Sequence, residues 1–242
     1  MPLDPSQPVL YIVGDVHLTG EQGPFLPWLD RLAARPPARL VILGDLFEYW
    51  IDTSATVLRF TGVFERLRTL HRLGWRIDLI RGNREMVAGR RLAMAAGTPL
   101  RWPSLDLTLG SRRVRVVHGD RLCGQVGQRL FIAWLSSFWF RTLQAAHPAW
   151  AQNLVALGIR RLSRGAQDRR YRAGRHPRFD PRWVRGAAQG VDTLVAGHIH
   201  QQQRLNVAGV DLLIVGDWPP EGGQWIEGFS DGHLRQVKER LT

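Results

Sequence analysis

The sequence predicts an α/β fold in which helices cover a sheet. Over the first hundred residues, short apolar runs that suit buried strands alternate with stretches of helical spacing. Several of these runs end in Gly or His beside a carboxylate, an amide or an imidazole, as loops at the carboxyl edge of a sheet do. With 242 residues, of which 44% are hydrophobic, the chain can bury one sizeable core. We therefore expect a single domain over residues 1–242.

Strands and helices alternate in the first half of the chain. Pro36 and Pro37 are suited to stop the first helix, and Gly74 and Gly97 to end the next two. This alternation is typical of an α/β core. Strands are expected over residues 9–13, 40–43 and 76–80, and helices over residues 25–35, 57–73 and 86–96.

The second half returns to strands, most of them in hairpins. Apolar and polar residues alternate over 105–109, and Gly110 and Ser111 turn the chain into a second strand at 112–117. Further strands are expected over residues 194–196, 203–207, 210–215, 224–229 and 234–237.

The strand signal disappears between these two parts. Aromatic residues crowd residues 130–150, and ten arginines face only two aspartates over residues 160–185. The segment predicts a helical cap, rich in arginine and aromatic residues, that is inserted into the α/β core at about residues 124–185.

The formal net charge of +12 is almost entirely arginine, since Lys238 is the only lysine. A basic balance favours anionic partners, namely nucleic acid, phosphate-bearing substrates or an acidic membrane surface. Cys123 is the only cysteine, so no intrachain disulfide is expected. It is predicted to be a small buried residue and not a nucleophile. No signal peptide is evident, and the apolar stretch 130–140 is too short to span a bilayer, which needs about 20 residues. These features predict a cytoplasmic protein.

Seven polar side chains follow the apolar runs and form a mixed nitrogen and oxygen ligand set. His198 and His200 are one residue apart in an extended segment, so both imidazoles can face one site. Such a set suits Mn, Fe or Zn rather than Ca, and seven ligands exceed the needs of one tetrahedral ion. Two metal ions can activate a water and clamp a phosphoryl group. The predicted ligands are Asp15, His17, Asp45, Asn83, His118, His198 and His200.

Each of these residues also has an ordinary explanation when it is taken singly. Asp15 or Asp45 after a glycine suits a turn or a helix N-cap, and Asn83 suits a turn. His118 alone is more often a buried histidine whose hydrogen bonds are satisfied. Together, in order and each after its own apolar run, they favour a two-metal site in which a carboxylate such as Asp45 bridges the ions.

The five blocks that carry these residues resemble the signature of the calcineurin-like metallophosphoesterases. The resemblance covers most of the chain outside the cap, and it implies a four-layer α/β/β/α sandwich. It further implies that Asp15, His17, Asp45 and His200 hold one metal ion, while Asp45, Asn83, His118 and His198 hold the other.

Details within these blocks are similar to one branch of that family, the UDP-2,3-diacylglucosamine hydrolases of lipid A synthesis. Arg84 stands where many family members have His, and the runs 44–50 and 118–123 also match this branch, although Glu85 stands where it usually has Asp. The resemblance implies Mn²⁺-dependent hydrolysis of a UDP-linked acylated glucosamine to UMP and 2,3-diacylglucosamine 1-phosphate by a peripheral inner-membrane enzyme. The cap would contact the anionic membrane surface, and no nucleic-acid partner is expected. The implied catalytic residues are Arg84, Asn83 and His198, and the candidate substrate contacts are Asn83, Arg84, Ser163, Arg164 and Arg169.

Two rival hypotheses remain open. A metallophosphoesterase acting on another phosphodiester, such as a nucleotide or nucleic acid, would need an open basic groove, whereas a lipid enzyme needs an apolar chamber beneath the arginines. A non-catalytic scaffold with this fold would have no need of the metal ligands, and this chain has all seven.

Overall fold

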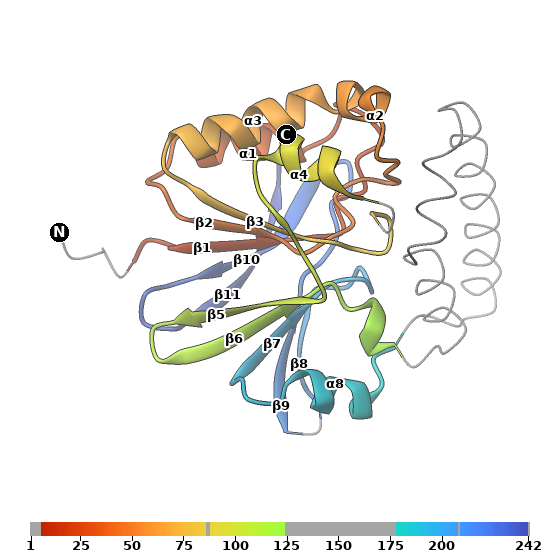
Figure 1. The fold of residues 1–242 in the computed structure, drawn as a ribbon. Helices are drawn as coiled ribbons and strands as arrows, with labels where there is room; N and C mark the ends of the chain where they lie inside the picture. Colours follow the sequence, from red (N-terminus) through yellow and green to blue (C-terminus); the bar gives the residue numbers. More distant parts are fainter. Residues whose placement is uncertain (1–5, 86–87, 124–177, 208, 242) are drawn as a thin grey trace.

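The computed structural model describes residues 6–85, 88–123, 178–207 and 209–241 (Figure 1). Its strands form two sheets, in agreement with the predicted α/β class. In these described ranges, no helix has the length and apolar character that crossing a membrane requires.

The first sheet has six strands in the order β11-β10-β1-β2-β3-β4. The strands β1 to β4 run parallel, while β10 pairs antiparallel with both β1 and β11. All four residues of β1 are buried, as expected for a strand covered on both faces. The bounds are Leu10–Val13 for β1, Arg39–Ile42 for β2, Arg76–Ile80 for β3, Leu100–Arg101 for β4, Gly222–Gly228 for β10 and Leu234–Arg240 for β11.

The second sheet has five strands in the order β5-β6-β7-β9-β8. Its centre is parallel, with β7 between β6 and β9, and its two outer pairs are antiparallel hairpins. The bounds are Ser104–Leu109 for β5, Arg112–Val117 for β6, Thr193–Ala196 for β7, Gln203–Val207 for β8 and Val210–Ile214 for β9.

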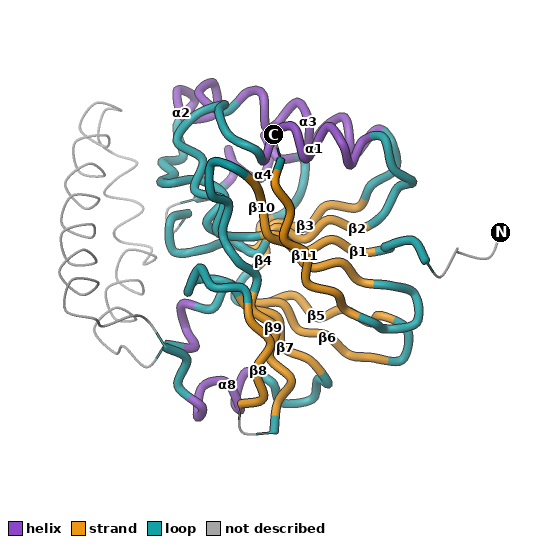
Figure 2. The backbone as a smooth tube through the Cα atoms, turned by 180° about the vertical axis from the view of Figure 1, so that it is seen from behind, coloured by secondary structure: helices purple, strands orange, loops and turns teal. Residues whose placement is uncertain are grey.

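Helices cover the outer face of each sheet and complete four layers (Figures 1 and 2). The helices α1 and α3 lie over the first sheet, and α8 lies beneath the second. The four-layer prediction is therefore confirmed. The bounds are Phe25–Ala33 for α1, Ser54–Arg59 for α2, Thr61–Arg72 for α3, Arg90–Ala96 for α4 and Pro181–Ala187 for α8.

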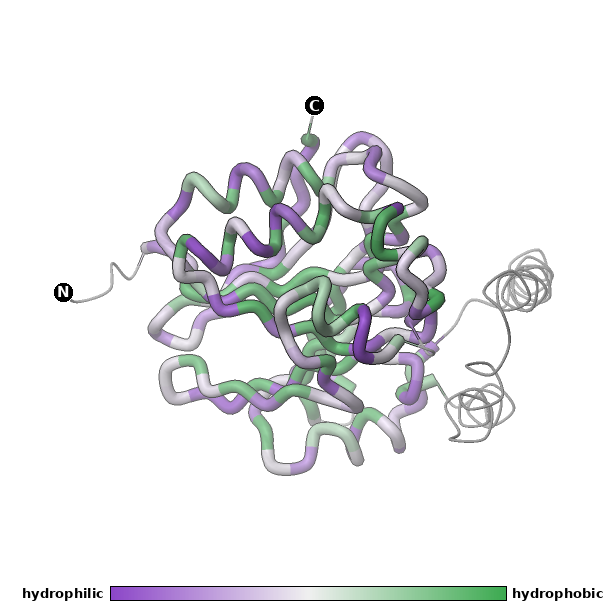
Figure 3. The backbone as a smooth tube through the Cα atoms, turned by 45° about the horizontal axis from the view of Figure 1, so that its top comes forward, coloured by the Kyte–Doolittle hydropathy of each residue, from purple (hydrophilic) through white to green (hydrophobic). Residues whose placement is uncertain are grey.

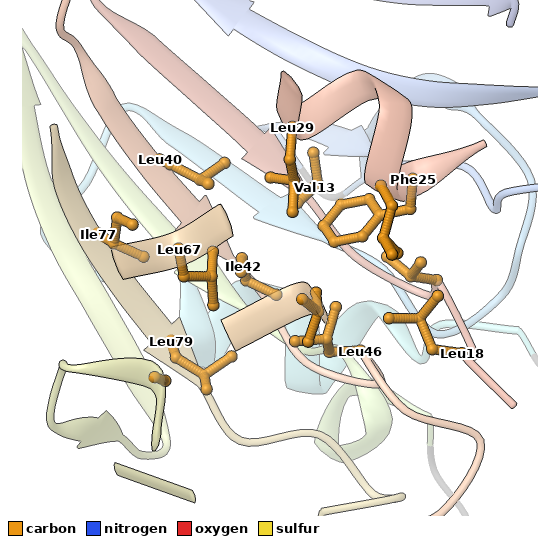
Figure 4. Close-up of a cluster of buried hydrophobic side chains, with 14 of the residues drawn as sticks. Val13, Leu18, Phe25, Leu29, Leu40, Ile42, Leu46, Leu67, Ile77 and Leu79 are labelled. Atoms are coloured by element: carbon orange, nitrogen blue, oxygen red, sulfur yellow. The ribbon is translucent and has the colours of Figure 1, made fainter. Parts of the chain in front are cut away.

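Three apolar clusters hold the layers together. One joins the helices to the first sheet, where Phe25 of α1, Leu67 of α3 and Ile42 of β2 converge (Figure 4). A second fills the space between the sheets, and the third places Val184 of α8 against the second sheet. Hydrophobic segments accordingly follow the strands through the interior (Figure 3). Removing this apolar surface from water is the main force that stacks the layers.

Two predicted helix boundaries are wrong. The helix expected over 57–73 is two helices, because it begins three residues earlier and breaks at Phe60. The buried Phe60 ring packs on Phe47 at 4.5 Å between centroids, so tertiary packing overrides the helical periodicity. The helix expected from residue 86 begins only at Arg90, after Gly89 in a non-helical conformation.

Most of the predicted cap, residues 124–177, lies outside the described residues. Its described end contains most of α8, which the sequence predicted only as part of a helical segment and not as a separate helix. This helix begins with Asp180 as N-cap and Pro181 at the first helical position. The short strand β4 was also not predicted, because a two-residue strand leaves no periodic signal.

Candidate metal centre

The predicted ligands lie in the loops that follow five parallel strands. Asp15 and His17 follow β1, Asp45 follows β2 and Asn83 follows β3, all in the first sheet. His118 follows β6, and His198 and His200 follow β7, in the second sheet. The carboxyl edges of the two sheets therefore supply one shared set of side chains.

The first group consists of Asp15, His17 and His200, whose ligand atoms all lie within 4.8 Å of one another. The Nε2 atoms of the two imidazoles are 3.1 Å apart. Asp15 Oδ1 lies 3.7 Å from His200 Nε2. Two nitrogens and one oxygen thus converge as they would around a single cation.

The second group consists of Asp45, His118 and His198, whose ligand atoms also lie within 4.8 Å of one another. Asn83 completes it, because its Oδ1 lies 2.8 Å from His118 Nε2 and 3.1 Å from His198 Nδ1. Asp45 Oδ1 lies 3.6 Å from His118 Nε2. A bridging role for Asp45 between the two groups stays a prediction.

The two groups are joined through the backbone. The His198 N–H donates to Asp15 Oδ2 at 2.6 Å, so a residue of the second group fixes the carboxylate of the first. His118 Nδ1 lies 3.2 Å from the carbonyl oxygen of Leu43, which orients that imidazole so that its Nε2 faces the centre.

The backbone of these loops is strained where the ligands sit. Among the described residues, five non-glycine residues have positive φ values, and all five are predicted ligands. Left-handed backbone is costly for residues with a Cβ atom and persists where the surrounding structure imposes it. The residues are Asp15, His17, Asp45, His198 and His200, with φ between 50° and 72°.

Burial opposes charge on both kinds of ligand. Desolvation raises the pKa of Asp15 to about 8 and that of Asp45 to about 7. Burial lowers the pKa of His17 to about 2, and it also lowers the pKa values of His198 and His200. These three imidazoles are therefore neutral at neutral pH, which is the form that binds a metal ion, and a cation would favour the ionised carboxylates.

The donor set fits two divalent cations. Asp15 Oδ1 is buried and has no hydrogen-bond partner in the described structure, although a buried oxygen of this kind is normally paired. Two neutral imidazole nitrogens that face each other at 3.1 Å gain only one hydrogen bond between them, whereas both can bind a shared cation. Neutral imidazoles with carboxylate and amide oxygens suit transition metals such as Mn, Fe or Zn.

Arg84 lies beside the second group. Its Nε is 3.8 Å from Asp45 Oδ2, its backbone N–H donates to Asp45 Oδ1 at 2.8 Å, and its side chain is only 15% exposed. The guanidinium charge lowers the pKa of Asp45 against the larger effect of burial. Arg84 is thus placed to meet an anion that binds at the centre.

Two glutamates near the site were not predicted as functional. Glu85 is buried and its carboxylate accepts hydrogen bonds from the backbone N–H groups of Asp45, Phe47 and Gly82 at 2.9 to 3.1 Å. Glu48 is buried beside His17 and Arg84. In the sequence, both could have been found as acidic residues that lie within or next to a loop bearing predicted ligands.

The glycines before the ligands permit close contact between loops. A Cβ atom on Gly82 would lie 2.3 Å from Asp45 Oδ1 and 2.4 Å from the Asp45 backbone nitrogen. A side chain at this position would therefore push the ligand loop of β2 away from that of β3.

We expect Gly82→Ala to lower the free energy of unfolding by about 1–3 kcal/mol, the usual cost of overpacking. Chemical denaturation measures this change, and cation binding should weaken in parallel because Asp45 moves. Gly186→Ala is the control, since its new methyl group would meet no atom within 4 Å. A free energy of unfolding of Gly82→Ala equal to that of the wild type would contradict the predicted clash.

The raised carboxyl pKa values predict a pH dependence of stability for the metal-free protein. Asp15, Asp45 and Glu85 have pKa values of about 8, 7 and 7, against 3.8 and 4.5 for ordinary Asp and Glu. The folded state therefore retains protons that the unfolded chain has released, and this contribution to stability is lost as the pH rises through these values. The imidazoles with lowered pKa values act in the opposite direction, because the unfolded chain still protonates them near their ordinary pKa of 6.5, and this effect fades as the pH rises above that value.

We thus expect the free energy of unfolding of the metal-free protein to fall between pH 6.5 and 8. Denaturant titrations in the presence of a chelator measure it. Saturating Mn²⁺ should remove the fall, because a bound cation keeps the carboxylates ionised at both pH values. A rise in metal-free stability over this window would contradict the assignment.

Other predicted residues stand apart from the centre. Cys123 is buried, as expected, and burial raises the pKa of its thiol to about 12, so it is not a nucleophile at neutral pH. The candidate substrate contacts Ser163, Arg164 and Arg169 lie outside the described residues.

Comparison with known proteins identifies the family. The model of the calcineurin-like phosphoesterases matches residues 8–202, a range that contains all seven predicted ligands. The chain belongs to this family. The resemblance inferred from the motifs is therefore confirmed.

The relatives of this phosphoesterase are similar over nearly their whole length. It is 32% identical over 238 residues to a UDP-2,3-diacylglucosamine hydrolase of Pseudomonas aeruginosa, covering 93% of this chain and 96% of that protein. A hydrolase of the same name from Pseudomonas savastanoi is 31% identical over 241 residues, with 92% and 94% covered. One from Escherichia coli is 29% identical over 219 residues, with 87% and 91% covered. Among solved structures, Chaetomium thermophilum Vps29 aligns with a TM-score of 0.41 and 13% identity over 96% of this chain and 97% of that chain.

Proposed function

We propose that this phosphoesterase hydrolyses the diphosphate of UDP-2,3-diacylglucosamine. In this reaction water adds to one phosphorus atom and the bond to the bridging oxygen breaks, so that UMP and 2,3-diacylglucosamine 1-phosphate each keep one phosphate. The observation that carries the proposal is the convergence of seven ligand side chains next to Arg84, in a chain whose relatives bear the name of this hydrolase.

The seven side chains are proposed to hold two divalent cations. Asp15, His17 and His200 would hold the first, and Asn83, His118 and His198 the second, with Asp45 shared between them. When bound, the two cations supply an activated water and neutralise charge on the phosphate oxygens. Mn²⁺ is the proposed metal, and Fe²⁺ or Zn²⁺ also suits this donor set.

Arg84 is proposed to bind an oxygen of the diphosphate. A guanidinium can donate two parallel hydrogen bonds to a phosphate and stabilise charge that develops there without giving up a proton. Since UMP is a better leaving group than an alkoxide, the reaction does not depend on a histidine acid at this position. Asn83 and His198 are the other proposed catalytic residues, because both belong to the second ligand group, beside which Arg84 lies.

The proposed site of action of this phosphoesterase is the cytoplasmic face of the inner membrane. Its diacylated substrate is a membrane lipid, and the arginines of segment 160–185 would contribute roughly 1 kcal/mol each near an anionic surface. Vesicle cosedimentation with anionic and with neutral lipid tests this contact, and equal binding to both would argue against it.

A turnover assay tests the proposed reaction. We expect the Mn²⁺-loaded protein to release UMP from UDP-2,3-diacylglucosamine, and the metal-free protein to release none. Bis-p-nitrophenyl phosphate is the comparison substrate. Hydrolysis of the nitrophenyl ester without turnover of the lipid nucleotide would favour a phosphoesterase with another substrate, and loss of both with no bound transition metal would favour a scaffold.

A further inference from the structure

Glu48 is a buried carboxylate whose two oxygens face two different residues of the centre. Its Oε2 lies 3.5 Å from His17 Nδ1, and its Oε1 lies 3.8 Å from Arg84 Nη1. The glutamate side chain is 10% exposed, and those of His17 and Arg84 are 18% and 15% exposed. One carboxylate therefore lies between a proposed metal ligand and the proposed phosphate-binding arginine.

The backbone holds Glu48 in this place. Its N–H donates to the carbonyl oxygen of Leu18 at 3.0 Å, next to His17 in the chain. The N–H of Trp50 donates to the carbonyl oxygen of Arg84 at 3.1 Å. The segment 48–50 is thus attached to the loop of His17 on one side and to Arg84 itself on the other.

The contact with His17 bears on which nitrogen of the imidazole carries the proton. His17 Nε2 faces His200 Nε2 within the first group, while Nδ1 faces Glu48. A carboxylate beside Nδ1 favours the tautomer with the proton on Nδ1, which leaves the lone pair of Nε2 free for a cation. Such carboxylate–histidine pairs orient metal ligands and increase their basicity.

The contact with Arg84 bears on the guanidinium. Glu48 Oε1 and Asp45 Oδ2 each lie 3.8 Å from a nitrogen of this side chain, so two carboxylates direct it. A long side chain that is already oriented loses less conformational entropy when it binds a phosphate.

We propose that Glu48 is a positioning residue, which orients His17 toward a cation and Arg84 toward the phosphate through a single carboxylate. The Arg84 half of this inference rests on the proposed function, whereas the His17 half requires only that the centre binds cations.

Two substitutions separate the proposed effect of Glu48 on His17 from its proposed effect on Arg84. Glu48→Gln keeps an oxygen beside His17 Nδ1, but it presents a neutral amide to Arg84. Glu48→Ala removes the carboxylate and therefore its contacts with both His17 and Arg84. Glu227→Gln is the matched control, because Glu227 is also buried, also faces two arginines, and lies on β10 outside the ligand loops.

Cation binding is measured by titrating metal-free protein with Mn²⁺ in a calorimeter. We expect Glu48→Ala to weaken binding at one of two sites by about 10–100-fold, and Glu48→Gln and Glu227→Gln to bind like the wild type. Unchanged binding in Glu48→Ala would overturn the His17 half. Should Glu48→Ala fail to fold, Glu48→Asp replaces it, because the shorter carboxylate withdraws from His17 at equal charge, and wild-type binding in that variant would overturn the same half.

Kinetics at saturating Mn²⁺ test the Arg84 half. We expect Glu48→Gln to raise KM for UDP-2,3-diacylglucosamine by about tenfold, while Glu227→Gln leaves it unchanged. Equal KM values for Glu48→Gln and the wild type would overturn this half. If the wild type does not turn over that substrate, the proposed function fails, and the same comparison with bis-p-nitrophenyl phosphate still decides the role of Glu48.

Discussion

Asp45→Ala is expected to lose at least ~100-fold in turnover of UDP-2,3-diacylglucosamine, the scale of removing one strong electrostatic stabiliser from an active site. Asp45 is 2% exposed, and its carboxylate lies 3.6 Å from His118 Nε2 and accepts from the Arg84 N–H. The substitution therefore removes a ligand and an anchor of the arginine loop together.

Metal analysis of the same variant tests the bridging role. A shared ligand should weaken both cation sites, whereas a ligand of the second group alone should weaken one. Asp30→Ala is the control, since Asp30 is half-exposed and pairs with Arg66 on the surface. Full activity in Asp45→Ala would exclude the bridging role.

Arg84→Ala is expected to lower kcat/KM by at least ~100-fold while both cations stay bound. The arginine touches the carboxylates of Asp45 and Glu48 and is no predicted metal ligand, so its loss removes phosphate contacts and leaves the donor atoms in place. Arg84→Lys keeps the charge but loses the planar pair of donors, and we expect a rate between those of wild type and Arg84→Ala.

Steady-state kinetics and metal content, measured on the same preparations, check this expectation. Arg66→Ala is the control, because Arg66 lies away from the ligand loops, where it pairs with Asp30 on the surface and donates to the Gly62 carbonyl oxygen within α3. An Arg84→Ala variant that lost cations in proportion to activity would show that the arginine supports the metal sites instead of the phosphate.

The sequence was most informative where chemistry and periodicity coincide. A strand followed by Gly and a ligand recurs four times, and a fifth strand leads directly into His118. Each of these predicted strands is present in the structure with its ligand at the carboxyl edge. Helix boundaries were less predictable. At the break the Phe60 ring packs on Phe47, which lies outside both helices, and no local pattern carries that contact.

Chain order and residue type were enough to predict the layered α/β class, the family and the seven ligand candidates, because strand period and ligand chemistry are local properties. The distances that bring those ligands together, the strained backbone beneath five of them, and the placement of Glu48 and Glu85 were decided only by the tertiary structure. These features arise where loops from two sheets meet, and the distances between such loops depend on how the sheets pack and on glycines such as Gly82 that let the loops approach.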